Sequence, residues 1–277
     1  MLQEPPHKIF ILVRVLFLGH NFNTEKRSLI SLAKLILKDP RGFRDIIQNA
    51  SGVVSEGVFR ISNNGLVMKE LDPSRIAMVE FDFPPTAFES LEVESEEKLG
   101  VNLEELLNVL KRLRPEDTLT LESDKGKLTV SFAINKYSRS FKIPLLDLGG
   151  QETPTINVQF TSKYSILSDA LSSSIKDAAT VADEIIFGSF KDGTLLISAS
   201  SDKGSVEQML SKDSGMILDY DIAEEANAKY SLQYLETITS FKGSPSVFLE
   251  FARDKPLHLE YKMADGTVFQ FILAPRL

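Results

Sequence analysis

The sequence predicts an α+β protein built from two similar domains, each with two helices packed on antiparallel sheets. The first observation is a repeated hairpin: residues 57–72 and 184–202 each contain two strand-like runs around a turn. The turn is Asn-Gly at Gly65 and Asp-Gly at Gly193, and such dipeptides favour tight hairpins because Gly tolerates positive φ. These two glycines lie 128 residues apart.

The second observation is a repeated helix-and-hairpin segment. Residues 102–132 and 231–263 each combine an amphipathic helix, a break, a strand, a turn containing Asp-Lys and another strand. Leu121 and Leu249, in the strands that follow the helices, are again 128 residues apart. The same offset at two distant places indicates a duplication. Between the copies, residues 145–155 contain a Gly pair, acidic residues and Pro, which predicts an exposed connector.

The first helix is predicted over residues 39–51. Asp39 is a good N-cap, and Pro40 suits the first helical position. One apolar stripe follows at helical spacing, formed by Phe43, Ile46, Ile47 and Ala50. Arg41 and Arg44 lie on the opposite, solvent-facing side.

The second helix is predicted from residue 102 to the break at Pro115. Its buried stripe consists of Leu103, Leu106, Leu107, Leu110 and Leu113. Its polar face carries Lys111 and Arg112, and Arg114 precedes the break.

The third helix, at residues 165–179, is predicted to expose Ser172, Ser173 and Lys176 and to bury Leu167, Leu171, Ile175 and Ala178. The fourth is predicted to bury Leu235, Ile238 and Phe241 and to expose Gln233, Glu236, Thr237 and Ser240. The strands between the helices alternate in polarity, as in residues 117–124, so each sheet should bury one face.

Composition excludes several kinds of site. The 277 residues include no Cys and three His, which excludes disulfides, thiol chemistry and a histidine-rich metal site. The net charge is −8, so a surface that binds nucleic acid would need locally concentrated Lys and Arg. Residues 8–18 form an apolar run interrupted by Arg14, which is too short for a membrane-spanning helix and suggests an extra strand or an unstructured leader.

The cationic residues of the helices recur on equivalent faces, which suggests a shared function. Helices that present Lys and Arg from one side of a continuous sheet would form a concave electropositive surface. Such a surface suits phosphates and does not read bases. Taken singly, each cation is more simply interpreted as part of an ordinary solvated helix face, and only the recurrence favours a shared function.

No catalytic motif is evident. Residues 188–194 have the glycine spacing of a phosphate-binding loop but lack its Lys and lie on a hairpin. The acidic pairs at Glu104 and Glu224 are expected to be solvated, and His258 has no evident partner. We therefore expect no enzyme, cofactor or metal, and the remaining alternative of another class is a carboxylate-dependent hydrolase.

Two segments resemble a known family. Residues 71–84 (LDPSRIAMVEFDFP) and 261–277 (YKMADGTVFQFILAPRL), with the duplicated units, resemble sliding clamps of the proliferating-cell-nuclear-antigen family, archaeal type. The resemblance covers residues 32–277 and implies the DNA-clamp fold, in which three subunits form a ring around duplex DNA. Such clamps serve DNA replication and repair as processivity factors, tether polymerase, flap endonuclease and ligase through short peptide motifs, and are opened by a clamp loader. In an archaeon the protein would be cytoplasmic and nucleoid-associated.

The resemblance also implies domain boundaries and a DNA-facing surface. It divides the chain into an extension at 1–31, clamp domain 1 at 32–145, a connector at 146–155 and clamp domain 2 at 156–277. The implied DNA-facing residues are Arg41, Arg44, Lys111, Arg112 and Lys176. The fourth helix departs from the family's basic lining, since its outer face carries Glu236 and no Lys or Arg.

A pocket for partner peptides is implied as well. The matching residues are Leu71, Ile76, Leu148, Pro154, Pro256, Ile272, Ala274, Pro275 and Leu277. An incoming peptide would cover the apolar carboxyl-terminal segment. Residues 149–152 are Gly, Gly, Gln and Glu where the family often has apolar side chains, which leaves partner affinity and partner choice open.

Ring closure in the family pairs edge strands, and these match residues 136–144 and 203–211. The candidate interface residues are Phe141, Ile143, Val206 and Met209. Pairing head to tail would satisfy both edges. Two alternatives remain, a homotrimer and an obligate subunit of a heterotrimer.

Overall fold

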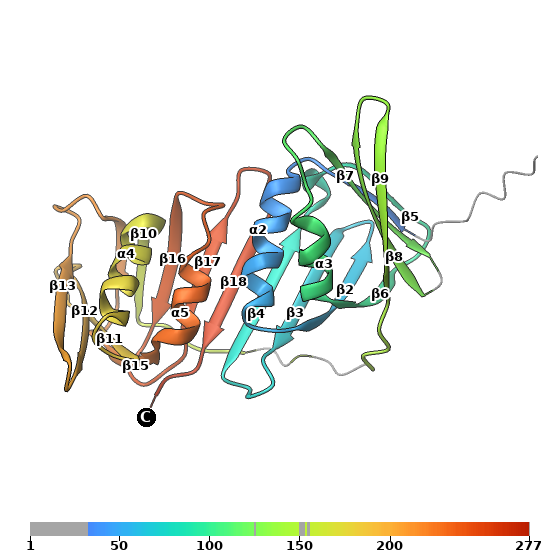
Figure 1. Ribbon diagram of the computed structural model, residues 1–277. Helices are drawn as coiled ribbons and strands as arrows, with labels where there is room; N and C mark the ends of the chain where they lie inside the picture. The colour runs from blue at the N-terminus through green and yellow to red at the C-terminus, as the bar shows by residue number, and fades with distance from the viewer. Residues whose placement is uncertain (1–32, 125, 150–152, 154–155, 277) are drawn as a thin grey trace, which may run out of the picture. The chain divides into compact units, whose positions relative to one another are not determined.

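The computed structural model describes residues 33–124, 126–149, 153 and 156–276. Within these residues, three antiparallel sheets are accompanied by four α-helices and one short 3-10 turn, Pro85–Ala87. The helices are α2 (Pro40–Ser51), α3 (Leu103–Leu110), α4 (Ser168–Ala179) and α5 (Leu232–Thr239). Figure 1 shows all four on one side of the strands.

The largest sheet has nine strands in the order β14-β10-β16-β17-β18-β4-β3-β2-β6. Four of them come from the first half of the chain: β2 (Glu56–Ser62), β3 (Gly65–Leu71), β4 (Ala77–Phe83) and β6 (Glu97–Asn102). Five come from the second half: β10 (Ser162–Leu167), β14 (Ile217–Ile222), β16 (Ser246–Phe251), β17 (Leu257–Lys262) and β18 (Val268–Leu273). The halves meet where β18 pairs with β4, for instance Phe271 with Val79.

The other two sheets each belong to one half of the chain. A five-stranded sheet, in the order β5-β1-β7-β8-β9, consists of β1 (Ala33–Leu37), β5 (Phe88–Val93), β7 (Thr118–Asp124), β8 (Lys127–Ile134) and β9 (Tyr137–Pro144). A four-stranded sheet, in the order β13-β12-β11-β15, consists of β11 (Glu184–Ser189), β12 (Leu195–Ser201), β13 (Gly204–Leu210) and β15 (Asn227–Ser231).

The topology confirms the duplication. The order β5-β1-β7-β8-β9 of the first half recurs as β14-β10-β16-β17-β18, and β4-β3-β2-β6 recurs as β13-β12-β11-β15. In each copy one helix follows the first strand and a second helix follows the sixth. By this equivalence β9 corresponds to β18 and β13 to β4. Within the described residues, β9 and β13 are sheet edges, whereas β18 and β4 pair with each other.

Two of the four helices, α2 and α3, begin where a local side chain satisfies their first backbone N–H groups. The Asp39 carboxylate accepts hydrogen bonds from the N–H groups of Arg41 (3.1 Å) and Gly42 (2.9 Å), as predicted for its N-cap role. The side chain of Asn102 accepts from the N–H of Glu105 at 2.9 Å and so caps α3. These caps fix where two of the four helices start.

Three helix predictions were wrong in detail. Helix α3 ends at Leu110 rather than reaching Leu113, which lies half-buried in the turn after it. Leu167 belongs to β10 and is 36% exposed, because the chain turns into α4 directly after it. Ser172 is 1% exposed on the buried side of α4, where its small side chain fits between helix and sheet.

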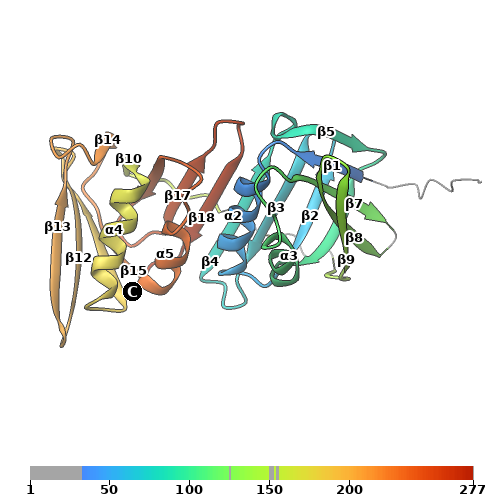
Figure 2. The same cartoon turned by 45° about the horizontal axis from the view of Figure 1, so that its top comes forward.

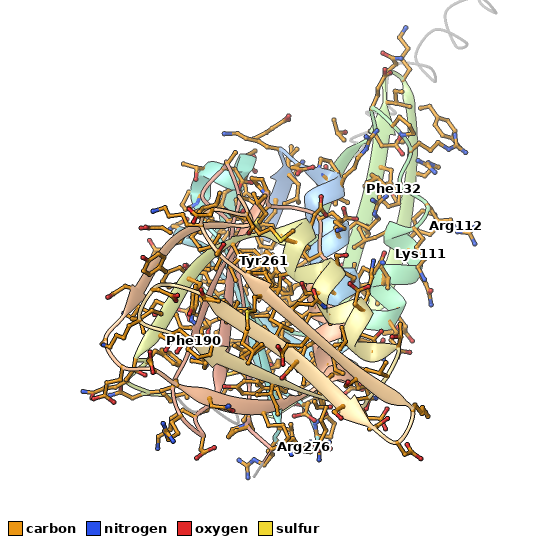
Figure 3. The ribbon with its side chains drawn as sticks, turned by 90° about the vertical axis from the view of Figure 1, so that its left-hand side faces the viewer. Lys111, Arg112, Phe132, Phe190, Tyr261 and Arg276 are labelled. Carbon is orange, nitrogen blue, oxygen red and sulfur yellow. The ribbon has the colours of Figure 1, made fainter. Side chains whose placement is uncertain are left out.

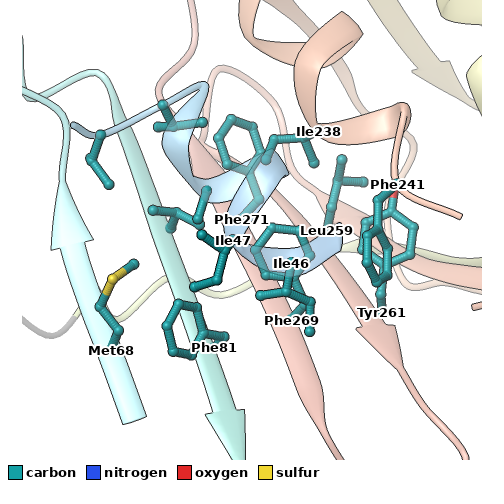
Figure 4. Close-up of a cluster of buried hydrophobic side chains, with 14 of the residues drawn as sticks. Ile46, Ile47, Met68, Phe81, Ile238, Phe241, Leu259, Tyr261, Phe269 and Phe271 are labelled. Carbon is teal, nitrogen blue, oxygen red and sulfur yellow. The ribbon is translucent and has the colours of Figure 1, made fainter. Parts of the chain in front are cut away.

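A continuous core lies beneath the helices. Ile46 and Ile47 of α2 pack with Ile238 of α5 over aromatic side chains of β4, β17 and β18, as Figure 4 shows. Helices α2 and α3 contact each other, as do α4 and α5, and α2 contacts α5. The helices therefore form one row, α3-α2-α5-α4, which Figure 2 shows from a second direction.

Candidate functional site

Exposed cations lie on the helix row. Arg41 on α2, Lys111 and Arg112 in the turn after α3, and Lys176 on α4 are all exposed. Figure 3 shows Lys111 and Arg112 at the end of α3, where their side chains extend into solvent. Helix α5 exposes Gln233 and Glu236, so the described cations of this row come mainly from the first half of the chain.

Arg44 differs from these residues because its charge is already paired. Its guanidinium contacts Oδ1 of the neighbouring Asp45 through Nε at 2.9 Å and Nη2 at 2.7 Å. Both side chains are about one-third exposed, at 30% and 35%. The sequence prediction did not consider Asp45, although a carboxylate next to Arg44 in the sequence can compete with a phosphate for its guanidinium.

A buried ion pair holds the turn that carries Lys111 and Arg112. Arg139 of β9 pairs with the carboxylate of Asp117, whose side chain is 1% exposed. Arg139 also donates from Nη1 to the carbonyl of Arg112 at 3.1 Å, and the same carboxylate accepts from the N–H of Arg114 at 2.7 Å. The pair therefore ties β9 to the end of α3. Sequence reasoning missed it because its members lie 22 residues apart on different elements.

On the other face of the nine-stranded sheet, three apolar side chains form a cross-strand row. Met78 of β4 lies opposite Leu71 of β3 on one side and Ile272 of β18 on the other. Directly paired residues project from the same face of a sheet, so the three side chains are neighbours. Ile76 lies in the turn that precedes β4, and its carbonyl accepts a hydrogen bond from the N–H of Ala274 at 2.8 Å. Met78, which was absent from the prediction, joins the predicted residues.

Asp72 organises the turn at the end of this row. Its buried carboxylate accepts hydrogen bonds from the backbone N–H groups of Ser74 (3.1 Å), Ile76 (2.7 Å) and Ala77 (2.7 Å). Burial pushes the pKa of Asp72 upward, but these bonds and one from the Tyr234 hydroxyl outweigh burial and hold the pKa below its usual value.

The other predicted pocket residues are more scattered. Pro256 precedes β17, next to the pairing of Leu257 with Leu273, and Pro275 follows β18 half-buried. Leu148 lies elsewhere, in a hollow of about 230 Å³ formed with residues of β2 and β6. It reaches that hollow because the connector begins by bonding to β6, Leu146 N–H to Gly100 carbonyl at 2.8 Å. Pro154 and Leu277 lie outside the described residues.

The two edge strands expose apolar side chains. Phe141 of β9 and Val206 of β13 are half-buried, while Met209 is 64% exposed. Ile143 is 4% exposed and so belongs to the core of its own sheet rather than to the free surface.

The residues considered for catalysis do not converge. Glu104 and Glu224 are exposed, and residues 190–194 form a turn that binds its own backbone, Phe190 N–H to Thr194 carbonyl at 3.1 Å. His258 does have a partner: its Nδ1 lies 2.9 Å from the carboxylate of Glu250. No group of three or more His, Asp or Glu able to hold a metal ion occurs in the described part of the chain. None of the helices described is long and apolar enough to cross a membrane.

Comparison with known proteins defines the class of this duplicated fold. Residues 33–148 match the N-terminal domain of proliferating cell nuclear antigen, and residues 156–276 match its C-terminal domain. The chain is 38% identical over 250 residues to DNA polymerase sliding clamp 1 of Pyrobaculum aerophilum, covering 89% of this chain and all of that protein. It is 34% identical over 248 residues to the DNA polymerase sliding clamp of Thermofilum pendens, with 89% and 100% covered.

Solved structures agree with these relatives. The proliferating cell nuclear antigen of Thermococcus kodakaraensis has a TM-score of 0.83 at 30% identity, covering 88% of this chain and 100% of that one. A chain of the PCNA2–PCNA3 complex of Sulfolobus tokodaii has a TM-score of 0.81 at 30% identity, with 88% and 99% covered. The chain belongs to the proliferating cell nuclear antigen family.

Proposed function

We propose that this chain is a subunit of a DNA sliding clamp, a ring that encircles duplex DNA without sequence specificity and tethers DNA polymerase as a processivity factor. The clamp itself catalyses no reaction. The observation that carries the proposal is the pairing of β18 with β4 inside the chain, while their equivalents β9 and β13 are edges among the strands that the structure describes. A neighbouring subunit can repeat that pairing, and head-to-tail repetition closes a ring when the rotation fits.

The internal pairing predicts the register between subunits. Phe271 lies opposite Val79 in the β18–β4 pair, and the hairpin registers make Phe141 equivalent to Phe271 and Val206 equivalent to Val79. Phe271 and Val79 are 1% and 0% exposed, whereas Phe141 and Val206 are half-buried. Pairing β9 with β13 of the next subunit would bury Phe141 against Val206, which the hydrophobic effect favours.

The helix row would line the hole of the ring. Arg41, Lys111, Arg112 and Lys176 would contact DNA phosphates, while the partnered Arg44 would contribute less. Most of the attraction would come from clamp domain 1, because α5 exposes Glu236. Contacts of this kind are weak, salt-dependent and indifferent to base sequence.

The row of Leu71, Met78 and Ile272, with Ile76 and Ala274, would be the partner-peptide pocket. Its ligands would be short motifs with one aliphatic and two aromatic side chains, carried by the polymerase, the clamp loader, a flap endonuclease or a ligase. The same proposal includes clamp domains at 32–145 and 156–277 with a connector at 146–155. It also places the protein in the cytoplasm of an archaeon, on the DNA.

Light scattering and a primer-extension assay test the proposal together. We expect a particle of three times the 30.9 kDa chain mass, and longer polymerase products when a loader places it on circular primed DNA. The likeness to a chain of a complex of two different clamps supports a second candidate, a subunit that closes a ring only with paralogues. That candidate predicts a monomer or dimer alone and stimulation only after other subunits are added. A protein that stimulates synthesis in neither setting is not a clamp.

A further inference from the structure

We propose that Tyr234 is a positioning residue for the partner pocket, because its hydrogen bond to Asp72 holds one wall of the pocket in place across the two domains. The inference rests on the proposed function, since it takes the row of Leu71, Met78 and Ile272 as a peptide site. Its structural basis is one bond: the Tyr234 hydroxyl donates to Oδ2 of Asp72 at 2.9 Å, between residues 162 positions apart.

The turn held by this bond depends strongly on Asp72. Three backbone N–H groups of residues 74–77 point at its carboxylate, and the turn closes with Asp72 N–H to Ala77 carbonyl at 2.8 Å. Arg75 within it has φ of +59°, a conformation that costs energy in a residue other than glycine. The surroundings must therefore stabilise the turn, and Asp72 supplies most of the contacts that do so.

Tyr234 anchors this turn to a rigid element. It lies on α5, whose neighbouring residues Leu235 and Ile238 are fully buried in the core. The tyrosine itself is half-buried, and burial together with the Asp72 carboxylate raises the pKa of its hydroxyl. The hydroxyl therefore keeps its proton and donates to an ionised carboxylate, a bond stronger than one between neutral groups.

The opposite side of the turn meets the carboxyl-terminal strand. The Ile76 carbonyl accepts from the Ala274 N–H, and the next residues continue to a bond between Arg276 N–H and the Lys229 carbonyl at 2.7 Å. The turn is thus fixed between α5 and the segment after β18. Leu71 precedes it and Ile76 ends it, so displacement of the turn would move two of the pocket's apolar side chains relative to Ile272.

A second bond between the domains provides a matched control. The Ser240 hydroxyl, just after α5, lies 3.1 Å from Oδ1 of Asn49 on α2 and 2.7 Å from the Thr237 carbonyl, so its one proton is shared between a contact with the first half of the chain and a contact within its own helix. Like the Tyr234 bond, it connects the region of α5 to the first half of the chain. Unlike that bond, it joins two helices and contacts none of the turn residues 72–76. Removing either bond should therefore lower the stability of the contact between the domains. Only removal of the Tyr234 bond should also disturb the geometry of the pocket.

The experiment compares four forms of the intact protein: wild type, Tyr234→Phe, Ser240→Ala and Ile272→Ala. Each is titrated into a fluorescent synthetic peptide with one aliphatic and two aromatic residues on one helical turn, and each is unfolded in urea. We expect Tyr234→Phe to weaken peptide binding threefold to tenfold. Ser240→Ala should bind as wild type does, and Ile272→Ala should bind least. The midpoint of unfolding should fall for both Tyr234→Phe and Ser240→Ala, since each removes a contact of α5 with the first half of the chain.

A double-mutant cycle separates positioning from general destabilisation. Asp72→Ala and Tyr234→Phe should each weaken peptide binding, and adding Tyr234→Phe to Asp72→Ala should weaken it no further, since the acceptor of the tyrosine's bond is then already absent. Peptide affinity of Tyr234→Phe within twofold of wild type, or an equal loss in Ser240→Ala, overturns the inference and leaves the proposed function standing. Wild-type protein that does not bind the peptide overturns the proposed pocket, and the inference with it.

Discussion

The pairing of Arg44 with Asp45 makes a specific prediction about DNA binding. We compare Arg44→Gln with Lys111→Gln, two substitutions that each remove one positive charge from the helix row. Arg44 already contacts an aspartate oxygen at 2.7 Å, whereas Lys111 is exposed and makes no ion pair among the described residues. A cation that neutralises a phosphate releases counterions, so its removal reduces the slope of log affinity against log salt by about 0.9.

The expected magnitude follows from that slope. Loss of one full phosphate contact lowers affinity about fivefold at 0.15 M salt. We expect Lys111→Gln to show this loss and the reduced slope. For Arg44→Gln we expect less than half of each, because the guanidinium is already bound to Asp45 and is not free to contact a phosphate.

Equilibrium binding to a fluorescent linear duplex between 25 and 150 mM salt measures both quantities, and Gln233→Ala on α5 serves as an uncharged control. Equal slopes for Arg44→Gln and Lys111→Gln would refute the reasoning that the ion pair screens Arg44. No change of slope in either variant would refute the assignment of the helix row to DNA.

Three further predictions concern the edges, the buried ion pair and pH. In this cysteine-free chain, Phe141→Cys combined with Val206→Cys should give covalent oligomers with a short bismaleimide, and either substitution alone should give at most dimers; monomers from the double variant would contradict the proposed register. Arg139→Ala should lower the free energy of unfolding by about 3 kcal/mol, because Asp117 would be left buried and unpaired; a change under about 0.5 kcal/mol in urea unfolding would show that the pair is not buried in solution. The pKa of Asp72 is lower in the folded than in the unfolded state, so its stabilisation is present above about pH 4 and is lost as pH falls through the folded pKa; Asp72→Asn should lack that part of the acid dependence, and identical pH profiles would argue against it.

Local signals in the sequence predicted much of the fold. The Asn-Gly and Asp-Gly turns and the Asp39–Pro40 helix start are signals that act over a few residues, and the structure has the predicted hairpins and helix. The 128-residue offset repeats a pattern, and the structure has the predicted duplication. The end of α3 was harder to predict, because Leu113 has the right spacing for a helix but packs from a turn. Periodicity alone does not distinguish a leucine inside a helix from one in the turn that follows it.

Contacts between distant segments could not be predicted. The Arg139–Asp117 and Tyr234–Asp72 pairs join residues 22 and 162 positions apart, and nothing in the local pattern of either residue indicates its partner. The burial of Ser172 illustrates the same limit, since a serine at that spacing is usually solvated and only the packing of α4 on the sheet hides it. The resemblance implied Leu71 and Ile272 but not Met78, which cross-strand register places between them in the proposed pocket.

The pairing of β18 with β4 has a consequence for how such an assembly would open. Its two strands belong to one polypeptide, so after any separation the chain itself keeps them at high effective concentration and they rejoin rapidly. A β9–β13 contact between different chains has no such tether. An enzyme that opens the ring would therefore separate strands at a boundary between polypeptides, while the equivalent pair of strands inside each polypeptide stays together.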